Sequence, residues 1–171
     1  ESGVMSKREY KIFSNLVSLS NIQLSKILTP RTVVFSLPGE ITVKQALEKH
    51  YPIRFSRIPV YDGTPENIIG YVPRYLISEL LYKTETDTLI KDIAKPITIF
   101  PGLISVGDAM ERLIGQRKQI ALVVDEYGGM DGLVTMEDLI ETLLGDEIVD
   151  ETDMVEDMQE LARRRARRGY R

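Results

Sequence analysis

Short segments with similar apolar patterns occur twice along the chain, in the same order and at a nearly constant spacing. The matched segments are 41–47 with 104–110, 57–62 with 120–125, and 70–77 with 132–139. The partners in each pair are 62 or 63 residues apart. Self-similarity at a fixed period indicates a repeated supersecondary unit. We therefore predict two copies of one unit within this chain of 171 residues.

Within each unit the pattern predicts a helix, a strand, a turn, a strand and a second helix. Thr42 and Ser105 each stand ahead of a small-then-large apolar pair, as at the start of an N-capped helix. The segments 57–62 and 120–125 end at an aspartate and are typical of buried strands. Because the strands lack a clean apolar-polar alternation, helices should cover at least one face of the sheet. The expected fold class is α/β (α+β).

The two predicted units should pack against each other. One unit of about sixty residues buries too little apolar surface to be stable alone. Packing the pair about a pseudo-twofold axis would solve this and would create clefts in which small ligands bind. The expected segments are a connecting helical segment at 1–28, a first motif at 29–92, a second motif at 93–145, and an acidic stretch with a basic tail at 146–171.

The segment ahead of the first motif has the pattern of an amphipathic helix. Its apolar positions are Tyr10, Phe13, Leu16 and Val17, with Lys7, Arg8 and Lys11 on the opposite side. Pro30 ends any helix that continues from this segment. We expect a connecting helix that packs on the repeat, and a relay of motion to a preceding domain is a hypothesis added to it.

Composition excludes several classes of chemistry. The chain has no cysteine and one histidine, His50, so disulfides and zinc sites built from thiols or imidazoles are excluded. Nothing around His50 resembles a nucleophile elbow. The chain also lacks the glycine-rich phosphate loop and lysine of a nucleotide hydrolase. We expect no enzymatic activity.

The net charge of −4 is unevenly distributed. Six arginines lie in the last nine residues, and without their six positive charges the rest of the chain carries −10. An acidic body argues against nucleic acid as a partner. We expect the arginine-rich end to be disordered or a frayed helix, with contact to anionic lipid as the alternative. The acidic stretch 146–157 lacks the central glycine of a calcium-binding EF-hand loop.

The chain has no segment with the pattern of a membrane span. No apolar run approaches the ~20 residues that a bilayer-spanning helix needs. The first residues, 1–3, include no start methionine and none of the features of a signal peptide. We interpret the chain as a soluble piece of a longer protein.

Thr135 and Asp138 lie where a predicted strand passes into a helix. A helix N-terminus offers main-chain N–H groups and the positive end of the helix dipole to a phosphate. The Thr135 hydroxyl could donate to a phosphate or ribose oxygen, and the Asp138 carboxylate could accept from both hydroxyls of a ribose. The same spacing is also that of a capping box, which needs no ligand. Spacing alone leaves both interpretations open.

Four stretches, in order and correctly spaced, resemble a known family. They are 28–32, 56–61, 123–129 and 132–141. Over roughly residues 20–152 the chain resembles a pair of CBS motifs, also called a Bateman module. In detail it is similar to the CorC/cyclin-M family of hemolysin-related membrane proteins, which are linked to magnesium and cobalt efflux.

The resemblance implies a site for an adenine nucleotide, ATP or AMP, with ATP and Mg²⁺ preferred. The residues implied are Thr29, Ser56, Arg57, Ile58, Pro59, Thr135 and Asp138. Arg57 would neutralise phosphate charge, although it could instead pair with a carboxylate, and Ile58 and Pro59 would contact adenine. Glu137 would lie near the nucleotide-bound magnesium.

The first motif offers a weaker counterpart of this site. Pro73 and Leu76 occupy the positions that correspond to Thr135 and Asp138. Proline has no hydroxyl and leucine accepts no hydrogen bond, so we predict that this second position holds no ribose.

The resemblance also implies how the module is used. It would regulate an N-terminal transmembrane domain at the cytoplasmic face of the cell membrane, and it would form a homodimer. The function expected is control of divalent-cation efflux by the bound nucleotide. The alternative is a purely structural dimerisation module with no ligand.

Overall fold

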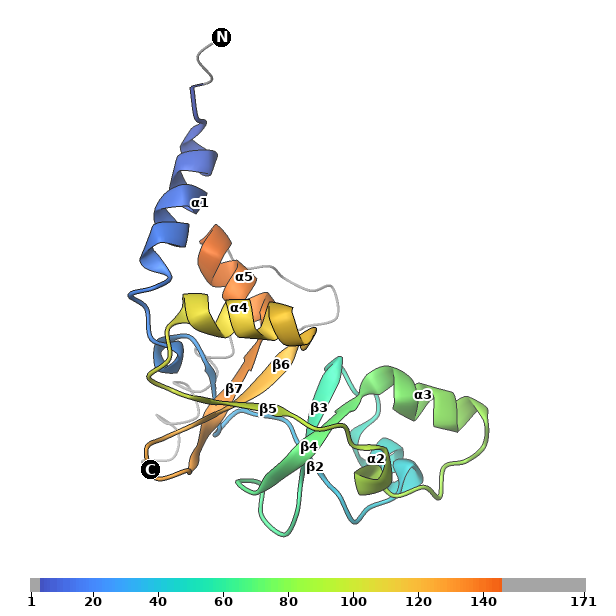
Figure 1. Cartoon of the computed structure of the whole chain (residues 1–171). Coiled ribbons are helices and arrows are strands. Elements are labelled where there is room, and N and C mark those ends of the chain that lie inside the picture. The colour runs from blue at the N-terminus through green and yellow to red at the C-terminus, as the bar shows by residue number, and fades with distance from the viewer. Residues whose placement is uncertain (1–3, 146–171) are drawn as a thin grey trace, which may run out of the picture. The chain divides into compact units, whose positions relative to one another are not determined.

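Both predicted repeat units are present in the computed structural model, which describes residues 4–145 (Figure 1). Its internal contacts divide the described chain into two compact units. Unit 1 contains residues 4–32 and 98–145, and unit 2 contains residues 33–97. Helices and strands are mixed in each unit, as the pattern predicts. The acidic stretch and arginine-rich tail expected at 146–171 lie outside the described residues.

Unit 2 follows the element order predicted for the first motif. Its elements are β2 (Leu37–Pro38), α2 (Val43–His50), β3 (Arg57–Tyr61), β4 (Ile68–Pro73), α3 (Arg74–Tyr82) and the 3-10 helix η2 (Ile90–Ile93). The strand order is β2-β3-β4, with β2 parallel and β4 antiparallel to β3. Ile58 and Val60 of β3 pack with Ile77 of α3 in a fully buried core. The helices therefore cover one face of this sheet.

Unit 1 repeats that arrangement and adds the N-terminal segment. Its elements are α1 (Lys7–Ser18), the 3-10 helix η1 (Leu24–Lys26), β1 (Thr29–Pro30), β5 (Thr98–Pro101), α4 (Val106–Gln116), β6 (Ile120–Val124), β7 (Met130–Thr135) and α5 (Met136–Leu144). The strand order is β1-β7-β6-β5. The strands β5 and β6 are parallel, and the other neighbours are antiparallel.

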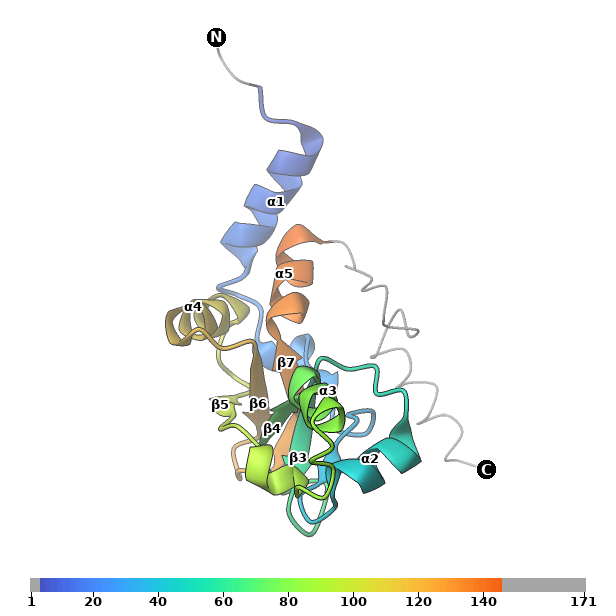
Figure 2. The same cartoon turned by 90° about the vertical axis from the view of Figure 1, so that its right-hand side faces the viewer.

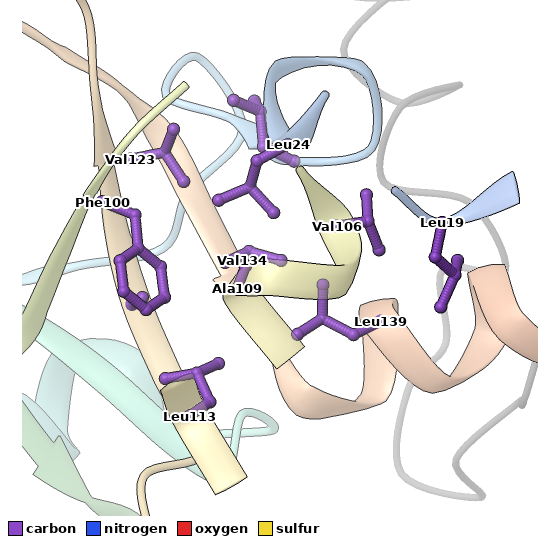
Figure 3. Close-up of a cluster of buried hydrophobic side chains, with 11 residues drawn as sticks. Leu19, Leu24, Phe100, Val106, Ala109, Leu113, Val123, Val134 and Leu139 are labelled. Atoms are coloured by element: carbon purple, nitrogen blue, oxygen red, sulfur yellow. The ribbon is translucent and has the colours of Figure 1, made fainter. Parts of the chain in front are cut away.

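The core of unit 1 fixes the position of α5. Figure 3 shows the side chains of this cluster, which come from η1, α4, α5, the sheet and the end of α1. Leu139 of α5 and Val134 of β7 are both fully buried in it. Burial of a leucine side chain stabilises a fold by roughly 1.5–3 kcal/mol. Leu139 therefore anchors the helix whose first turn holds the candidate site.

The predicted helix caps are confirmed in both units. The Thr42 hydroxyl accepts a hydrogen bond from the main-chain nitrogen of Gln45 at 3.2 Å, and α2 begins at the next residue. The Ser105 hydroxyl accepts from the main-chain nitrogen of Asp108 at 3.0 Å, and α4 begins in the same way. Each cap satisfies an N–H group that the helix itself leaves unpaired.

The short strand β1 pairs with the second motif, although it lies at the start of the predicted first motif, 29–92. Thr29 lies opposite Leu133, and Pro30 lies opposite Gly132. A Cβ atom at Gly132 would collide with the carbonyl oxygen of Thr29. Glycine at this position is therefore what lets β1 approach β7 so closely.

Helix α1 forms as predicted, but the predicted apolar residues are not what holds it against the repeat. Tyr10, Phe13, Leu16 and Val17 are all exposed. Both views show α1 running beside α5 (Figures 1 and 2). Polar groups join the two helices: the Asn15 amide donates to the carbonyl oxygen of Leu143 at 3.0 Å, and Lys11 Nζ donates to that of Gly145 at 3.3 Å.

Candidate functional site

Thr135 and Asp138 form a reciprocal capping box at the start of α5. The main-chain nitrogen of Thr135 donates to Asp138 Oδ2 at 2.7 Å, and the main-chain nitrogen of Asp138 donates to Thr135 Oγ1 at 3.3 Å. Both residues are half-buried. The strand β7 ends at Thr135, whose extended backbone turns the chain into the helix. The capping box foreseen from the spacing is therefore present.

The two side chains of the capping box also have donor and acceptor groups of the kind that a nucleotide needs. A threonine hydroxyl that accepts one hydrogen bond still carries a proton to donate, and a carboxylate has two oxygens with about four acceptor positions. The first turn of α5 adds the positive end of a helix dipole. This donor set fits a phosphate near Thr135 and a ribose near Asp138, because a carboxylate accepts from hydroxyls and repels phosphate.

Thr29 lies on the same face of the sheet as Thr135. Residues directly opposite each other in an antiparallel pair point to the same face, and Thr29 is opposite Leu133. Leu133 and Thr135 are two residues apart on β7, so they also share a face. The offset along the strand is about 7 Å. The structure therefore brings together two of the predicted residues that are far apart in the sequence.

The other predicted residues lie in unit 2, at the start of β3. Ser56 is exposed and precedes the strand, and Arg57 is half-buried. Ile58 and Val60 point into the core, so Arg57 and Pro59 point to the opposite face of the sheet. Pro59 is tolerated in this middle strand because β2 pairs only with Val60 and Tyr61.

Ile58 has a place that sequence reasoning did not foresee. Its side chain is 0% exposed and belongs to the core of unit 2. Because the whole residue is unexposed, neither its side chain nor its main chain is open to a ligand in this conformation. Pro59 is also buried, but it lies on the other face of β3. The predicted contact between adenine and Ile58 therefore remains a prediction.

The corresponding helix start in unit 2 is built differently. Pro73 precedes α3 without any side-chain cap, and Leu76 packs against the core. The Tyr75 hydroxyl accepts a hydrogen bond from Lys95 Nζ at 2.9 Å, which raises the pKa of Lys95. No hydroxyl or carboxylate replaces Thr135 and Asp138 at these positions.

Sequence reasoning gave no role to Arg74, which the structure connects to the loop ahead of two predicted residues of unit 2, Ser56 and Arg57. The guanidinium of Arg74 donates to main-chain carbonyls in this loop. The only sequence signal was an arginine where the second motif has Met136. That difference between the repeats did not indicate which groups the arginine would contact.

Two other kinds of feature are missing from residues 4–145. No group of three or more histidine, aspartate or glutamate side chains in this range could hold a metal ion. Glu137, predicted to lie near a nucleotide-bound magnesium, is exposed on α5.

None of the helices described here combines the length and the apolar character that crossing a bilayer requires.

Comparison with known proteins gives consistent matches. The sequence model of the CBS domain matches residues 90–145. The UPF0053 protein YhdT of Bacillus subtilis is 33% identical over 94% of the chain, which covers 35% of that protein. Hemolysin C of Rickettsia prowazekii is 33% identical over 87% of the chain, which covers 49% of that protein. The chain thus spans about a third to a half of the length of these relatives.

Two solved structures are similar over most of the chain. The CBS domain of the bacterial CNNM/CorC family Mg²⁺ transporter matches with a TM-score of 0.78 and 30% identity, covering 87% of this chain and 90% of that one. The same kind of domain in complex with ATP matches with a TM-score of 0.74 and 27% identity, covering 81% of this chain and 98% of that one.

Proposed function

Because this chain belongs to the CNNM/CorC family as its CBS-domain pair, we propose that it is a regulatory module that binds an adenine nucleotide and performs no chemistry. The observation that carries the proposal is the start of α5. There Thr135 and Asp138 are held by a core-anchored helix, and Thr29 lies on the same sheet face as Thr135. ATP with Mg²⁺ is the preferred ligand, and AMP is the second choice.

Each predicted residue has a defined role in this proposal. The Thr135 hydroxyl donates to a phosphate or ribose oxygen, and Asp138 accepts from the ribose hydroxyls. Arg57 supplies positive charge to the phosphates, with Ser56 beside it. Thr29 and Pro59 line the site, and Ile58 would contact adenine only if its unexposed position opened. Glu137 would lie near the nucleotide-bound magnesium. The neighbouring solved structure that contains ATP supports the choice of ligand.

The proposed control acts on a membrane partner through α1. A ligand can shift such a partner only if it binds two states of the module with different affinity. Helix α5 carries the proposed ligand residues in its first turn and contacts α1 at its last turn, which supports a path between them. We propose that the full-length protein is a homodimer that exports magnesium or cobalt, with this module at the cytoplasmic face of the membrane.

Titration calorimetry tests the proposal. ATP, ADP, AMP and S-adenosylmethionine should each be titrated with and without Mg²⁺. We expect ATP with Mg²⁺ to bind most tightly. At a free concentration one hundred times Kd, the ligand should stabilise the fold by about 2.7 kcal/mol in thermal unfolding. Absence of binding by every adenylate would refute the proposal.

A structural dimerisation module without ligand is the second candidate. The observation that favours it is that Thr135 and Asp138 already satisfy each other in the capping box. This candidate predicts no thermal shift with any adenylate. A nucleotide hydrolase would instead release phosphate on incubation with ATP and Mg²⁺, and our proposal predicts that none is released.

A further inference from the structure

Arg74, the first residue of α3, donates hydrogen bonds to the loop that leads into β3. Its Nη1 donates to the carbonyl oxygen of Arg54 at 2.9 Å and to that of Ile53 at 3.3 Å. Its main-chain nitrogen donates to the carbonyl oxygen of Ser56 at 2.9 Å. A single residue thus holds three carbonyls of the loop 51–56, which has no helix or strand of its own.

Comparison of the two repeat units shows which of these hydrogen bonds both units share and which are found in unit 2. In unit 1 the main-chain nitrogen of Met136 donates to the carbonyl oxygen of Gln119 at 3.0 Å, which matches the bond from Arg74 to Ser56. A methionine side chain has no N–H group to donate. The two guanidinium bonds are therefore an addition in unit 2, on the loop that precedes Ser56 and Arg57.

We propose that Arg74 is a positioning residue of the nucleotide site, which holds the loop 51–56 so that Ser56 and Arg57 are in place before the ligand arrives. This inference rests on the proposed function. Hydrogen bonds from a charged donor are stronger than neutral ones. They can therefore hold a loop that lacks the regular main-chain hydrogen bonds of a helix or a sheet. A loop that is already ordered does not lose further conformational entropy when the phosphate binds.

The test compares three arginine substitutions. Arg74→Met places at this position the residue that the second motif carries in the corresponding place, so the fold should accommodate it. Arg74→Lys keeps the charge and a donor, and should restore part of the effect. Arg54→Met removes an exposed arginine of the same loop and leaves the donor of Arg74 intact. It controls for the loss of one positive charge.

Two measurements are made on each variant. Calorimetry gives the Kd for ATP with Mg²⁺ and for adenosine. Hydrogen exchange gives the rate at which the main-chain amides of residues 53–57 exchange with solvent. We expect Arg74→Met to bind ATP about five- to tenfold more weakly, the size expected when roughly one residue must be ordered on binding. Adenosine affinity should be unchanged, because adenosine has no phosphate for Arg57. Exchange at 53–57 should be faster.

A double-mutant cycle separates positioning from a general effect on the fold. If Arg74 acts through Arg57, Arg74→Met should weaken ATP binding no further once Arg57→Met is present. Additive losses, an equal loss in Arg54→Met, or unchanged exchange at 53–57 would each overturn the inference. If the unaltered chain takes up no ATP, the proposed function fails and the positioning role fails with it. The exchange data would then still report whether Arg74 orders the loop.

Discussion

The Asp138 carboxylate accepts a hydrogen bond from the main-chain nitrogen of Thr135 at 2.7 Å, so the start of α5 and the proposed ribose site depend on the same side chain. Substitutions can separate these two roles. Asp138→Asn keeps an oxygen for the Thr135 nitrogen but removes the negative charge, and Asp138→Ala removes both.

Asp138→Ala should weaken ATP binding at least ~10-fold. Hydrogen bonds to a charged acceptor contribute about 1.5–3 kcal/mol each, and ~1.4 kcal/mol corresponds to a factor of ten. Asp138→Asn should also bind ATP more weakly, while its free energy of unfolding changes by less than about 1 kcal/mol because the cap persists. Calorimetry and urea unfolding measure the two effects. An unchanged ATP affinity in Asp138→Ala would refute the assignment of this site.

Thr135→Ala and Thr42→Ala form a matched pair, because each threonine closes a capping box at the start of a helix. Both substitutions should lower the free energy of unfolding by about 1 kcal/mol. Only Thr135→Ala should weaken ATP binding as well, because Thr42 belongs to no proposed ligand contact. If both variants lost ATP affinity equally, helix stability would explain the loss and Thr135 would have no direct contact with the ligand.

Gly132→Ala should destabilise the fold by roughly 3 kcal/mol, because the new methyl group meets the main chain of Thr29 and β1 must move. Gly115→Ala is the control, since Gly115 lies in α4 and has open space around it. That substitution should stabilise by up to about 1 kcal/mol through helix propensity. Urea unfolding gives both values, and the two changes should have opposite signs. A stable Gly132→Ala variant would contradict the close approach of β1.

Asn15→Ala should loosen α1 from α5 and lower stability by about 0.5–1.5 kcal/mol, because it removes the amide that donates to the Leu143 carbonyl. Ser14→Ala, on an exposed position of the same helix, should change stability by less than about 0.5 kcal/mol. Hydrogen exchange of α1 should be faster in Asn15→Ala and slower in the unaltered chain when ATP is added. An α1 that does not respond to ATP would remove the proposed relay.

Local patterns were sufficient to predict the repeat and the elements that recur within it. The capped starts of α2 and α4 and the helix after β7 were confirmed, because caps and apolar periodicity depend on residues close in sequence. The resemblance to the CorC/cyclin-M family was also confirmed. The short strands β1, β2 and β5 were not predicted as strands, since each has two to four residues and depends on partners distant in the sequence.

The capping box at the candidate site was predictable, because side-chain type and spacing determine it. A hydroxyl and a carboxylate three residues apart at a helix start predict the bonds seen between Thr135 and Asp138, whereas their role toward a ligand comes from the family resemblance and remains a prediction. A buried strand was predicted at 57–62, but it was not foreseen that the Ile58 side chain would face the core, because the direction of a side chain depends on which face of β3 the helices cover. The contacts of Arg74 were not foreseen either, because a flexible arginine finds its acceptors only in the folded loop.

The pairing of β1 with β7 also has a consequence for the order of folding. Thr29 and Leu133 are about a hundred residues apart, so the sheet of unit 1 stays incomplete until almost the whole described chain has been synthesised. The described residues of unit 2, 33–97, emerge before that point and are contiguous, which lowers the entropic cost of bringing them together. Pulse-labelled exchange should therefore detect protection in β3 and β4 before β1. If unit 2 folds first, the flexible length of chain between β1 and β7 becomes shorter, which helps β1 to reach its partner.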